Sequence, residues 1–482
     1  MKLLLVFMLS ISFLYSKELK SITLEEAIQI ALENNKRNKV SKLALEVANA
    51  QYNQALSANY PTINAMLVGI RKDESPIYQQ RGSFTLSSEL TKTLALANTL
   101  KESNAVVRQA QQTAIANTPA SAFPAGSISA DLDTTSYGRD TVKGSINLQY
   151  PVYTGGKISA IIEQAKLNKQ IAFNAMKREE ESVVFDTKKY FYGYVLTNEL
   201  HKIAKDSYER MQFISDLTKK FYESGESLTV KKTDYLSVQV TVTLIESIVS
   251  KLEANKNLVK SALINSMGLS WDSDVNISYT SRLVPPNYTL AKLVEKAYSS
   301  NKDINEIDIA LKITREQIKE KKAGHYPTLA FMGEVSRTYN SYEYGFLNED
   351  QRNRWNIGFA ANLPLFDGFK TTSEVEEKIA EKKKMYLIKD MLKDAVAMQV
   401  KNELTNALIG FKQIKTLKKA KKLAKDSREL NIRAYQIEAV EPKDVVQAQY
   451  IEAYVKADYL KYVHDYLISL AKIDKLVGKE LK

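Results

Sequence analysis

The chain has 482 residues, a formal net charge of +12 at pH 7 and no cysteine. The lack of cysteine excludes disulfides and thiolate-bound metal. The three histidines, His201, His325 and His464, are far apart in the sequence and show no ligand spacing. Because phosphate-loop and nucleophile-elbow motifs are also missing, the sequence predicts neither an enzyme nor a bound cofactor or metal.

The positive charge is mixed with negative charge along the chain. Lysines stand beside acidic residues, as in 376–378 and 381–384. Such mixing is typical of solvated helix faces. Aromatic residues do not alternate with the lysines, as they would in a site for single-stranded nucleic acid. We therefore expect no nucleic-acid partner.

The N-terminus has the pattern of a secretory signal. A charged start, Met1–Lys2, precedes 13 mostly apolar residues from Leu3 to Tyr15, which are too few to span a bilayer. We predict a signal peptide over residues 1–16; the alternative is an N-terminal membrane anchor. No later apolar run reaches 18 residues, so no transmembrane helix is predicted.

Two helices and a strand are predicted next. Thr23 and Glu26 have capping-box spacing at the start of a helix over 22–35. A second helix over 36–59 ends before Tyr60–Pro61, and a strand is expected over 62–70.

The following segment has no counterpart later in the chain. Residues 84–118 have helical composition, whereas 117–140 are rich in Pro, Ser, Gly and Thr and predict a loop.

Three further segments alternate between apolar and polar residues: 145–152, 329–336 and 356–365. Strands with one apolar face have this pattern. It fits a membrane barrel with a wet lumen, but also any half-buried sheet, so the alternation alone leaves both open.

Two strands end in the same way, at 150–157 and 363–370. In each segment a proline and an aromatic residue precede glycine and lysine. The junction glycines are Gly155, Gly156 and Gly368. Phe369 replaces the second glycine of the later copy. Glycine permits the φ that a sharp turn from strand to helix requires.

Each junction begins a helical run of about 65 residues, or ~100 Å at 1.5 Å per residue. These runs cover 158–222 and 371–436, and shorter helices return over 229–267 and 442–477. A helix over 302–325 precedes the third strand. In each half, the helix of about 24 residues before the strand and the returning helix of about 40 residues, stacked end to end, have together the length of the long run. This equality of length favours a hollow helical tube over a compact bundle.

The second half of the chain repeats the first. Equivalent residues lie 266 apart as far as the Tyr-Pro-Thr steps, 213 apart at the junctions and 210 apart in the returning helices. The first half therefore has 53 additional residues between Pro61 and Pro151. Constant offsets indicate duplication. They predict two repeats, residues 17–284 and 285–482.

The junctions, the Tyr-Pro-Thr steps at 60–62 and 326–328, and the Asp-to-Gln spacing that opens each returning helix resemble the TolC-like outer-membrane efflux family. The resemblance covers nearly the whole mature chain. It implies a mainly α fold with a small β part. Three chains would form a trimeric twelve-stranded outer-membrane β-barrel, continued by a long periplasmic α-helical barrel, with two pseudo-repeats per chain. The four strands of one chain cannot close a barrel, since about eight are needed.

The same resemblance implies a function and a location. The chain would be a passive exit duct in the outer-membrane lipid, extending into the periplasm, and would dock a periplasmic adaptor protein and an inner-membrane transporter. Residues of about 71–142 would lie mostly outside the cell. The alternatives are an exit duct for type I protein secretion and a non-channel periplasmic coiled-coil adaptor or scaffold. The departures from the family are the 53 additional residues, Phe369, and Glu438 in place of a glycine.

The turn between the second long helix and its returning helix is the candidate entrance. Asp444 falls in the first turn of the returning helix, where the helix dipole favours a carboxylate, and this is the structural alternative for its role. The resemblance implies that Asp444 belongs to an acidic ring at the periplasmic entrance. Gln447 stands where the family has its next acid. Asp234 and Tyr435 match positions that hold the entrance shut.

Aromatic residues flank the third and fourth strands: Tyr339, Tyr342, Tyr344, Phe346 and Trp355. They are interpreted as an outer-leaflet aromatic girdle, with ordinary loop aromatics as the alternative. Trp271, in the link between the halves, is expected to pack internally.

Overall fold

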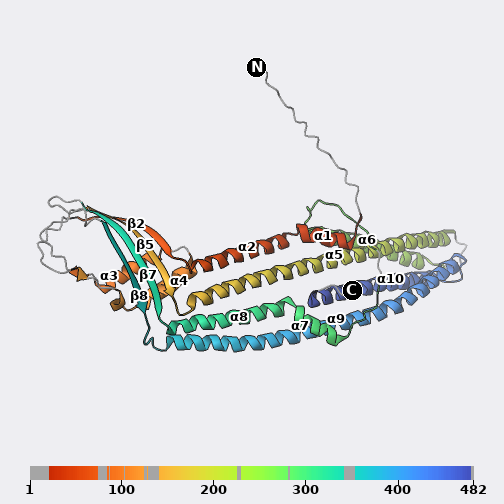
Figure 1. Ribbon diagram of the computed structural model, residues 1–482. Helices are drawn as coiled ribbons and strands as arrows, with labels where there is room; N and C mark the ends of the chain where they lie inside the picture. Colours follow the sequence, from red (N-terminus) through yellow and green to blue (C-terminus); the bar gives the residue numbers. More distant parts are fainter. Residues whose placement is uncertain are drawn as a thin grey trace, which may run out of the picture. The chain divides into compact units, whose positions relative to one another are not determined.

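A computed structural model describes residues 21–73, 84–85, 87–101, 104–123, 127–128, 140–224, 230–279, 283–340 and 353–478 (Figure 1). The chain forms two compact units. The helical unit comprises residues 1–45, 172–307 and 388–482, and the sheet unit comprises 46–171 and 308–387. Each unit takes segments from both predicted repeats. The predicted signal peptide lies outside the described residues.

The helices are named with their bounds here: α1 (Leu24–Asn34), α2 (Lys36–Ser57), α3 (Ser88–Thr99), α4 (Ala105–Ala116), α5 (Lys157–Ser224), α6 (Lys232–Ser266), α7 (Leu290–Ser300), α8 (Lys302–Lys322), α9 (Lys370–Gln436) and α10 (Pro442–Val477). The strands are β1 (Ser21–Ile22), β2 (Thr62–Arg71), β3 (Phe84–Thr85), β4 (Ser127–Ile128), β5 (Asp140–Tyr153), β6 (Asn276–Ile277), β7 (Thr328–Asn340) and β8 (Asn353–Asn362). Short 3₁₀ turns cover Ala120–Ala122 and Ala323–His325. The long helices α5 and α9 confirm the two predicted runs.

The sheet unit is organised around four antiparallel strands in the order β2-β5-β7-β8 (Figure 1). Strand β5 pairs with β2 on one side and with β7 on the other, so the two predicted repeats meet between β5 and β7. The ladder is regular except near Pro151, where the register with β7 shifts. This irregularity is expected because proline cannot donate to the ladder.

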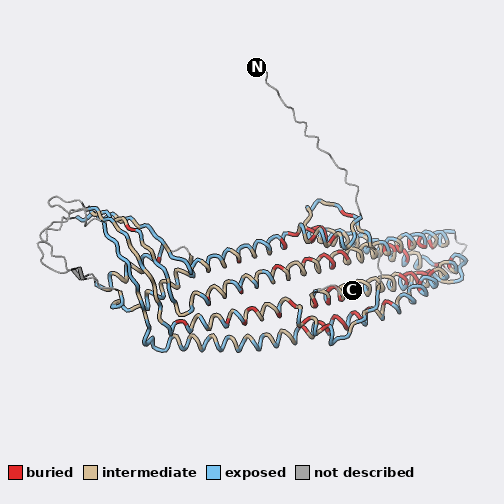
Figure 2. Tube along the Cα trace, viewed as in Figure 1, coloured by how far each residue is buried: buried red, intermediate tan, exposed pale blue. Residues whose placement is uncertain are grey.

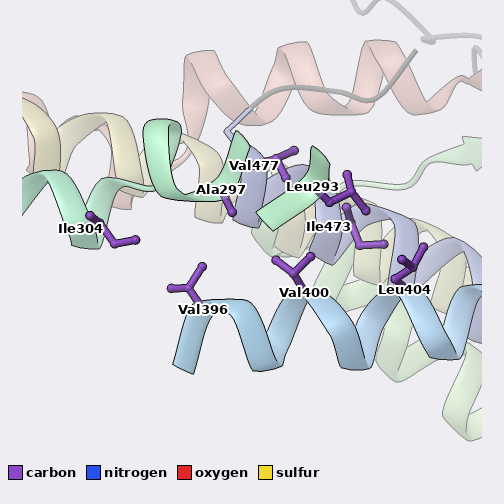
Figure 3. Close-up of a cluster of buried hydrophobic side chains, with 8 residues drawn as sticks. All are labelled: Leu293, Ala297, Ile304, Val396, Val400, Leu404, Ile473 and Val477. Carbon is purple, nitrogen blue, oxygen red and sulfur yellow. The ribbon is translucent and has the colours of Figure 1, made fainter. Parts of the chain in front are cut away.

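The helical unit is held together by buried apolar clusters between helices. One cluster joins α7 and α8 to α9 and α10 through Leu293, Ala297, Ile304, Val396, Val400, Leu404, Ile473 and Val477 (Figure 3). Another joins α5, α6, α9 and α10 through Met211, Ile214, Val238, Val242, Tyr435 and Val445. Fully burying one such aliphatic side chain contributes about 1.5–3 kcal/mol. In Figure 2 the buried positions appear as red segments at intervals along the helices.

The predicted start of the first helix is confirmed in atomic detail. The Glu26 carboxylate accepts a hydrogen bond from the Thr23 backbone N–H at 2.8 Å, and the Thr23 hydroxyl accepts one from Glu26. The helix ends at Asn35, whose side chain donates to the Ser266 carbonyl at 2.6 Å. The side-chain oxygen of Asn35 accepts from the backbone at the start of α2, and the equivalent Asn301 accepts in the same way at the start of α8.

Several predicted bounds differ from the structure. The strand predicted to reach residue 365 ends at Asn362, because Pro364 lacks the N–H that would continue the ladder. The α-helical part of 302–325 ends at Lys322 and continues as a 3₁₀ turn. The segment 84–118, which has helical composition, contains the two helices α3 and α4. No described helix is both long enough and apolar enough to cross a membrane.

Trp271 does not pack internally as expected, because its side chain is 90% exposed. Helix α6 is followed by Gly268, whose φ of 70° turns the chain away. Trp271 therefore stands on a surface turn of the isolated chain.

Candidate functional site

The four-stranded sheet has one apolar face and one polar face. Residues that pair directly across strands share a face. The pairs Ile146–Val335 and Val335–Trp355 place three large apolar side chains in one row. Most large side chains of the apolar face are exposed in the single chain, among them Ile63, Leu67, Ile146, Val335, Trp355, Ile357 and Phe359. In Figure 2 the strands are drawn mostly in pale blue.

The opposite face carries a polar row across all four strands. Asn64, Asn147, Glu334 and Asn356 are partners in register. Beside this row, the Lys143 ammonium lies 2.7 Å from the Glu334 carboxylate. The alternation predicted from the sequence is therefore present in the folded sheet. An exposed apolar face opposite a polar one suits lipid on one side and water on the other.

The junction glycines all have left-handed backbone. Gly155, Gly156 and Gly368 have φ values of 64°, 87° and 68°. Gly155 is also required by space, because a Cβ there would lie 2.8 Å from the Ala323 carbonyl oxygen. These two constraints explain why the chain turns from β5 into α5 at a glycine.

The two residues that depart from the family's glycines keep the same backbone conformation. Phe369 has a φ of 66° and Glu438 a φ of 55°. Non-glycine residues adopt this region at a cost of roughly 1–2 kcal/mol each. The departures noted in the sequence therefore leave the turns in place, with local strain.

The two acidic residues predicted at the entrance occupy equivalent positions. Asp444 accepts a hydrogen bond from the Glu441 backbone N–H at 3.2 Å, three residues before it. Asp234 accepts one from the Lys231 backbone N–H at 2.8 Å in the same way. Both carboxylates thus cap the start of a returning helix, as the structural alternative for Asp444 required. A capping carboxylate remains free to act on ions as well.

Charged groups of the α5–α6 and α9–α10 turns lie close to one another. Lys443 pairs with Glu441 at 2.5 Å, and this hydrogen bond lowers the pKa of the Glu441 carboxyl, with a further contribution from Lys231. The pKa of Lys443 is raised mainly by Glu441, with smaller contributions from Asp444 and Asp234. Lysines therefore stand beside the predicted acids. Gln447, one turn further along α10, is exposed.

Tyr435 is the buried member of the predicted entrance residues, with an exposed fraction of 1%. Its hydroxyl lies 2.7 Å from the Thr218 hydroxyl of α5. Because the single proton of Thr218 goes to the Ile214 carbonyl, Tyr435 is the donor. Burial raises the pKa of Tyr435, and the negative charge of Asp234 adds to this shift.

Thr218 is a functional candidate that the sequence reasoning missed. It follows Met211 and Ile214 at helical spacing, on the α5 face that packs in the apolar cluster. A threonine inside a helix can satisfy its hydroxyl on the carbonyl four residues earlier, as Thr218 does with Ile214. The sequence therefore carries no signal of the partner on α9.

Two of the flanking aromatic residues are visible and exposed. Trp355 lies on β8 and Tyr339 on β7, with exposed fractions of 73% and 60%. Tyr342, Tyr344 and Phe346 lie outside the described residues, as does part of the segment 71–142. The girdle stays a prediction.

Comparisons with known proteins identify the fold. Residues 293–479 match the family described as Outer membrane efflux protein. No curated protein sequence matches the chain. Among solved structures, the CmeC outer membrane channel of Campylobacter jejuni has 16% identity and a TM-score of 0.73, covering 94% of this chain and 85% of that one.

Two other channels give similar values. The outer membrane protein VceC of Vibrio cholerae has 14% identity and a TM-score of 0.71, over 95% of this chain and 97% of that one. The MtrE outer membrane channel of Neisseria gonorrhoeae, solved in its open state, has 14% identity and a TM-score of 0.70, over 95% and 89%.

The chain thus has the mostly helical fold of outer-membrane channels, with a small sheet, as predicted. The family match lies in the second predicted repeat, and the structural matches extend over both predicted repeats. The resemblance to the TolC-like outer-membrane efflux family is therefore confirmed, by the family match over residues 293–479 and by the fold of nearly the whole chain.

Proposed function

We propose that this protein is an outer-membrane exit duct that works with a periplasmic adaptor and an inner-membrane transporter. The observation that carries the proposal is the sheet with one exposed apolar face and one polar face. An apolar face formed by Leu67, Ile146, Val335 and Ile357 would be unfavourable in water. In a bilayer the same face contacts lipid, and the row of Asn147 and Glu334 lines the lumen.

A trimer completes the sheet. Strands β2 and β8 are the two edges of the four-stranded sheet, and open edges cannot persist in lipid because their backbone groups would lack partners. Three copies joined edge to edge would close a barrel of twelve strands. This number exceeds the minimum of about eight.

We infer the inner-membrane transporter and the adaptor from the lack of a nucleotide-binding motif in the sequence and from the resemblance to the efflux family. The sequence contains no phosphate-binding loop that could couple nucleotide hydrolysis to transport. A passive duct therefore depends on an inner-membrane transporter for energy, and on an adaptor to reach it. The exposed α9–α10 turn belongs to the proposed docking end.

Conductance in a planar lipid bilayer tests the channel role. Purified protein should form discrete conducting units and should be trimeric by native mass spectrometry in detergent. A stable monomer that does not conduct would instead support a periplasmic adaptor or scaffold. For the partners, deleting this gene and deleting the inner-membrane transporter should sensitise cells to the same compounds. The double deletion should add nothing, since both act in one route.

A further inference from the structure

A buried carboxylate on α10 gathers positive charges from three helices. The Glu452 side chain is 1% exposed, and one of its oxygens lies 2.8 Å from Arg428 Nε on α9. The same oxygen lies 3.5 Å from Arg210 Nη1 on α5. The other oxygen lies 2.9 Å from Lys456 Nζ, one turn along α10. These helices belong to both repeats.

A second carboxylate completes the arrangement at its edge. Asp206 on α5 lies 2.5 Å from Arg210 and 4.0 Å from Lys456. We refer to Glu452, Arg428, Arg210, Lys456 and Asp206 as the Glu452 cluster. Arg428 is itself buried and also pairs with Glu429 at 3.2 Å. The cluster therefore ties α10 to α5 and α9 through ion pairs in a largely desolvated place.

The cluster lies on the buried face of α10, and that face runs back to the α9–α10 turn. One turn closer to the start of the helix, Gln449 donates to the Ser207 hydroxyl of α5 at 2.9 Å, and both residues are buried. One turn nearer still to the start of α10, Val445 packs in the apolar cluster that contains Met211. Pro442 is the first residue of the helix. Residues 442, 445, 449 and 452 thus form one continuous stripe, from the turn to the cluster.

The first repeat shows that packing alone does not require these charges. With the offset of 210 residues, the position equivalent to Glu452 is Val242, which is buried in an apolar cluster. With the offset of 213, the position equivalent to Arg428 is Ser215, also buried. The same layer is therefore filled without ions in one repeat. Buried ion pairs often stabilise a fold no better than apolar residues do, and can instead specify register.

We propose that Glu452 is a positioning residue for the entrance: its carboxylate, held by Arg428 and Arg210, sets the register of α10 against α9 and α5 and so keeps the α9–α10 turn closed. This inference rests on the proposed channel function. Without the carboxylate, the positive charges of Arg428, Arg210 and Lys456 would face one another with only Asp206 and Glu429 nearby. Moving α10 away from α5 and α9 would relieve that repulsion, and would carry Asp444 with it.

The test is single-channel conductance of full-length trimers carrying Glu452→Gln, which keeps the shape and removes the charge. We expect the open occupancy to rise by about tenfold, a change equivalent to about 1.4 kcal/mol. The trimer should stay intact by native mass spectrometry. Glu452→Asp, which keeps the carboxylate on a shorter side chain, should hold occupancy closer to the wild-type value than Glu452→Gln. A residue that merely fills space would show the opposite order.

A matched control separates this role from general loosening. Asp474, on the same helix, pairs with Lys188 of α5 at 3.1 Å. It lies 22 residues beyond Glu452 along α10, and so further from the α9–α10 turn. Asp474→Asn should leave open occupancy unchanged. Equal effects of Asp474→Asn and Glu452→Gln would overturn the proposal, as would wild-type occupancy in Glu452→Gln.

A second variant covers the case in which Glu452→Gln does not assemble. Glu452→Val with Arg428→Ser reproduces the layer of the first repeat and leaves neither buried partner unpaired. It should assemble and still show raised open occupancy, because the ionic link between the helices is gone. Wild-type occupancy in this variant would contradict the inference. If the wild-type protein itself formed no conducting units, the proposed function would fail instead.

Discussion

Phe369 has a φ of 66° at the position where the first repeat has Gly156, whose φ is 87°. The backbone of the junction is therefore the same in both repeats, although only one of them has the residue suited to it. In the first repeat, Gly155 is constrained twice, by its φ and by the 2.8 Å approach to Ala323. Gly156 is constrained only by its φ, since nothing lies within 4 Å of a Cβ there. The two neighbouring glycines should thus differ in their tolerance of alanine.

We expect Gly155→Ala to destabilise the protein more than Gly156→Ala. Each change introduces left-handed strain of roughly 1–2 kcal/mol. At Gly155 the new methyl group also meets the backbone, so β5 and the turn at Ala323 must move apart. The measurement is the temperature at which detergent-solubilised protein loses its trimeric state.

Phe369→Ala is the control for the strain itself, because alanine keeps the φ problem and loses only the ring. The ring of Phe369 packs edge-on against Phe366, with centroids 5.5 Å apart, which is worth about 0.5–1.5 kcal/mol. Equal losses from Gly155→Ala and Gly156→Ala would show that the close approach does not matter.

Asp444 can be tested for its two roles separately. Asp444→Asn retains an oxygen that can accept from the Glu441 N–H but removes the charge. Asp444→Ala removes both. We expect both variants to lose cation preference, measured as the reversal potential in a salt gradient, because the negative charge at the entrance is gone. Only the alanine variant should also lose about 1 kcal/mol of stability from the missing cap.

Gln447→Glu is the complementary change, since it restores an acid at the second position of the proposed ring. It should increase cation preference. If Asp444→Asn leaves the reversal potential at the wild-type value, the carboxylate serves only to start α10. In that case the positive charge of Lys443, which interacts electrostatically with Asp444, would explain why the carboxylate does not attract cations.

The sequence was sufficient for the architecture because the repeat supplied an internal check. Strand-to-helix junctions at constant offset, long helical runs and alternating strands each predicted an element that is present. The predicted ends of elements were wrong where a single residue decides them, as where the strand predicted to reach residue 365 ends before Pro364. Gly268 and Gly478 lie 210 residues apart, the offset of the returning helices, and both have a left-handed φ.

The interior contacts could not be predicted in the same way. Glu452 and Arg428 lie more than 20 residues apart on different helices, and Asp206 lies in the other repeat. A charged residue in a helical pattern is read as solvent-facing unless its partners are known. Tyr435 was assigned to the entrance by resemblance, but its partner Thr218 emerged only from the packing of α5 against α9.

The hydroxyls of Tyr435 and Thr218 should be coupled. Tyr435→Phe and Thr218→Val each remove one member of a buried hydrogen bond, which is worth about 1 kcal/mol. If the pair also holds the entrance shut, each variant should raise conductance, and the double variant should add little to either. A double-mutant cycle on conductance and on unfolding measures this coupling.

Asp234→Asn provides the comparison for the proposed latch. It keeps the cap of α6 through its amide oxygen and removes the charge near Tyr435. Raised conductance in this variant would support the pairing of Asp234 with Tyr435 in closure. Additive effects of Tyr435→Phe and Thr218→Val would show that the two hydroxyls act independently.

Stability should fall at alkaline pH because of Tyr466 on α10. Its side chain is 1% exposed and its hydroxyl donates to the Val284 carbonyl. Burial raises the pKa of Tyr466 to about 12, whereas an unfolded tyrosine titrates near 10. Between these values the unfolded chain has lost the proton and the folded chain still holds it. Stability is therefore complete below about pH 10 and is lost as pH rises toward 12, by up to about 3 kcal/mol.

Unfolding by denaturant at a series of pH values measures this dependence. Tyr466→Phe should be less stable than wild type at neutral pH, because the Val284 carbonyl loses its donor. Between pH 10 and 12, however, the variant should lose stability less steeply, since phenylalanine has no proton to release. Tyr450→Phe, at an exposed position of the same helix, serves as the control and should follow the wild-type profile. If Tyr466→Phe and the wild-type protein lose stability in parallel over this range, other groups cause the alkaline loss.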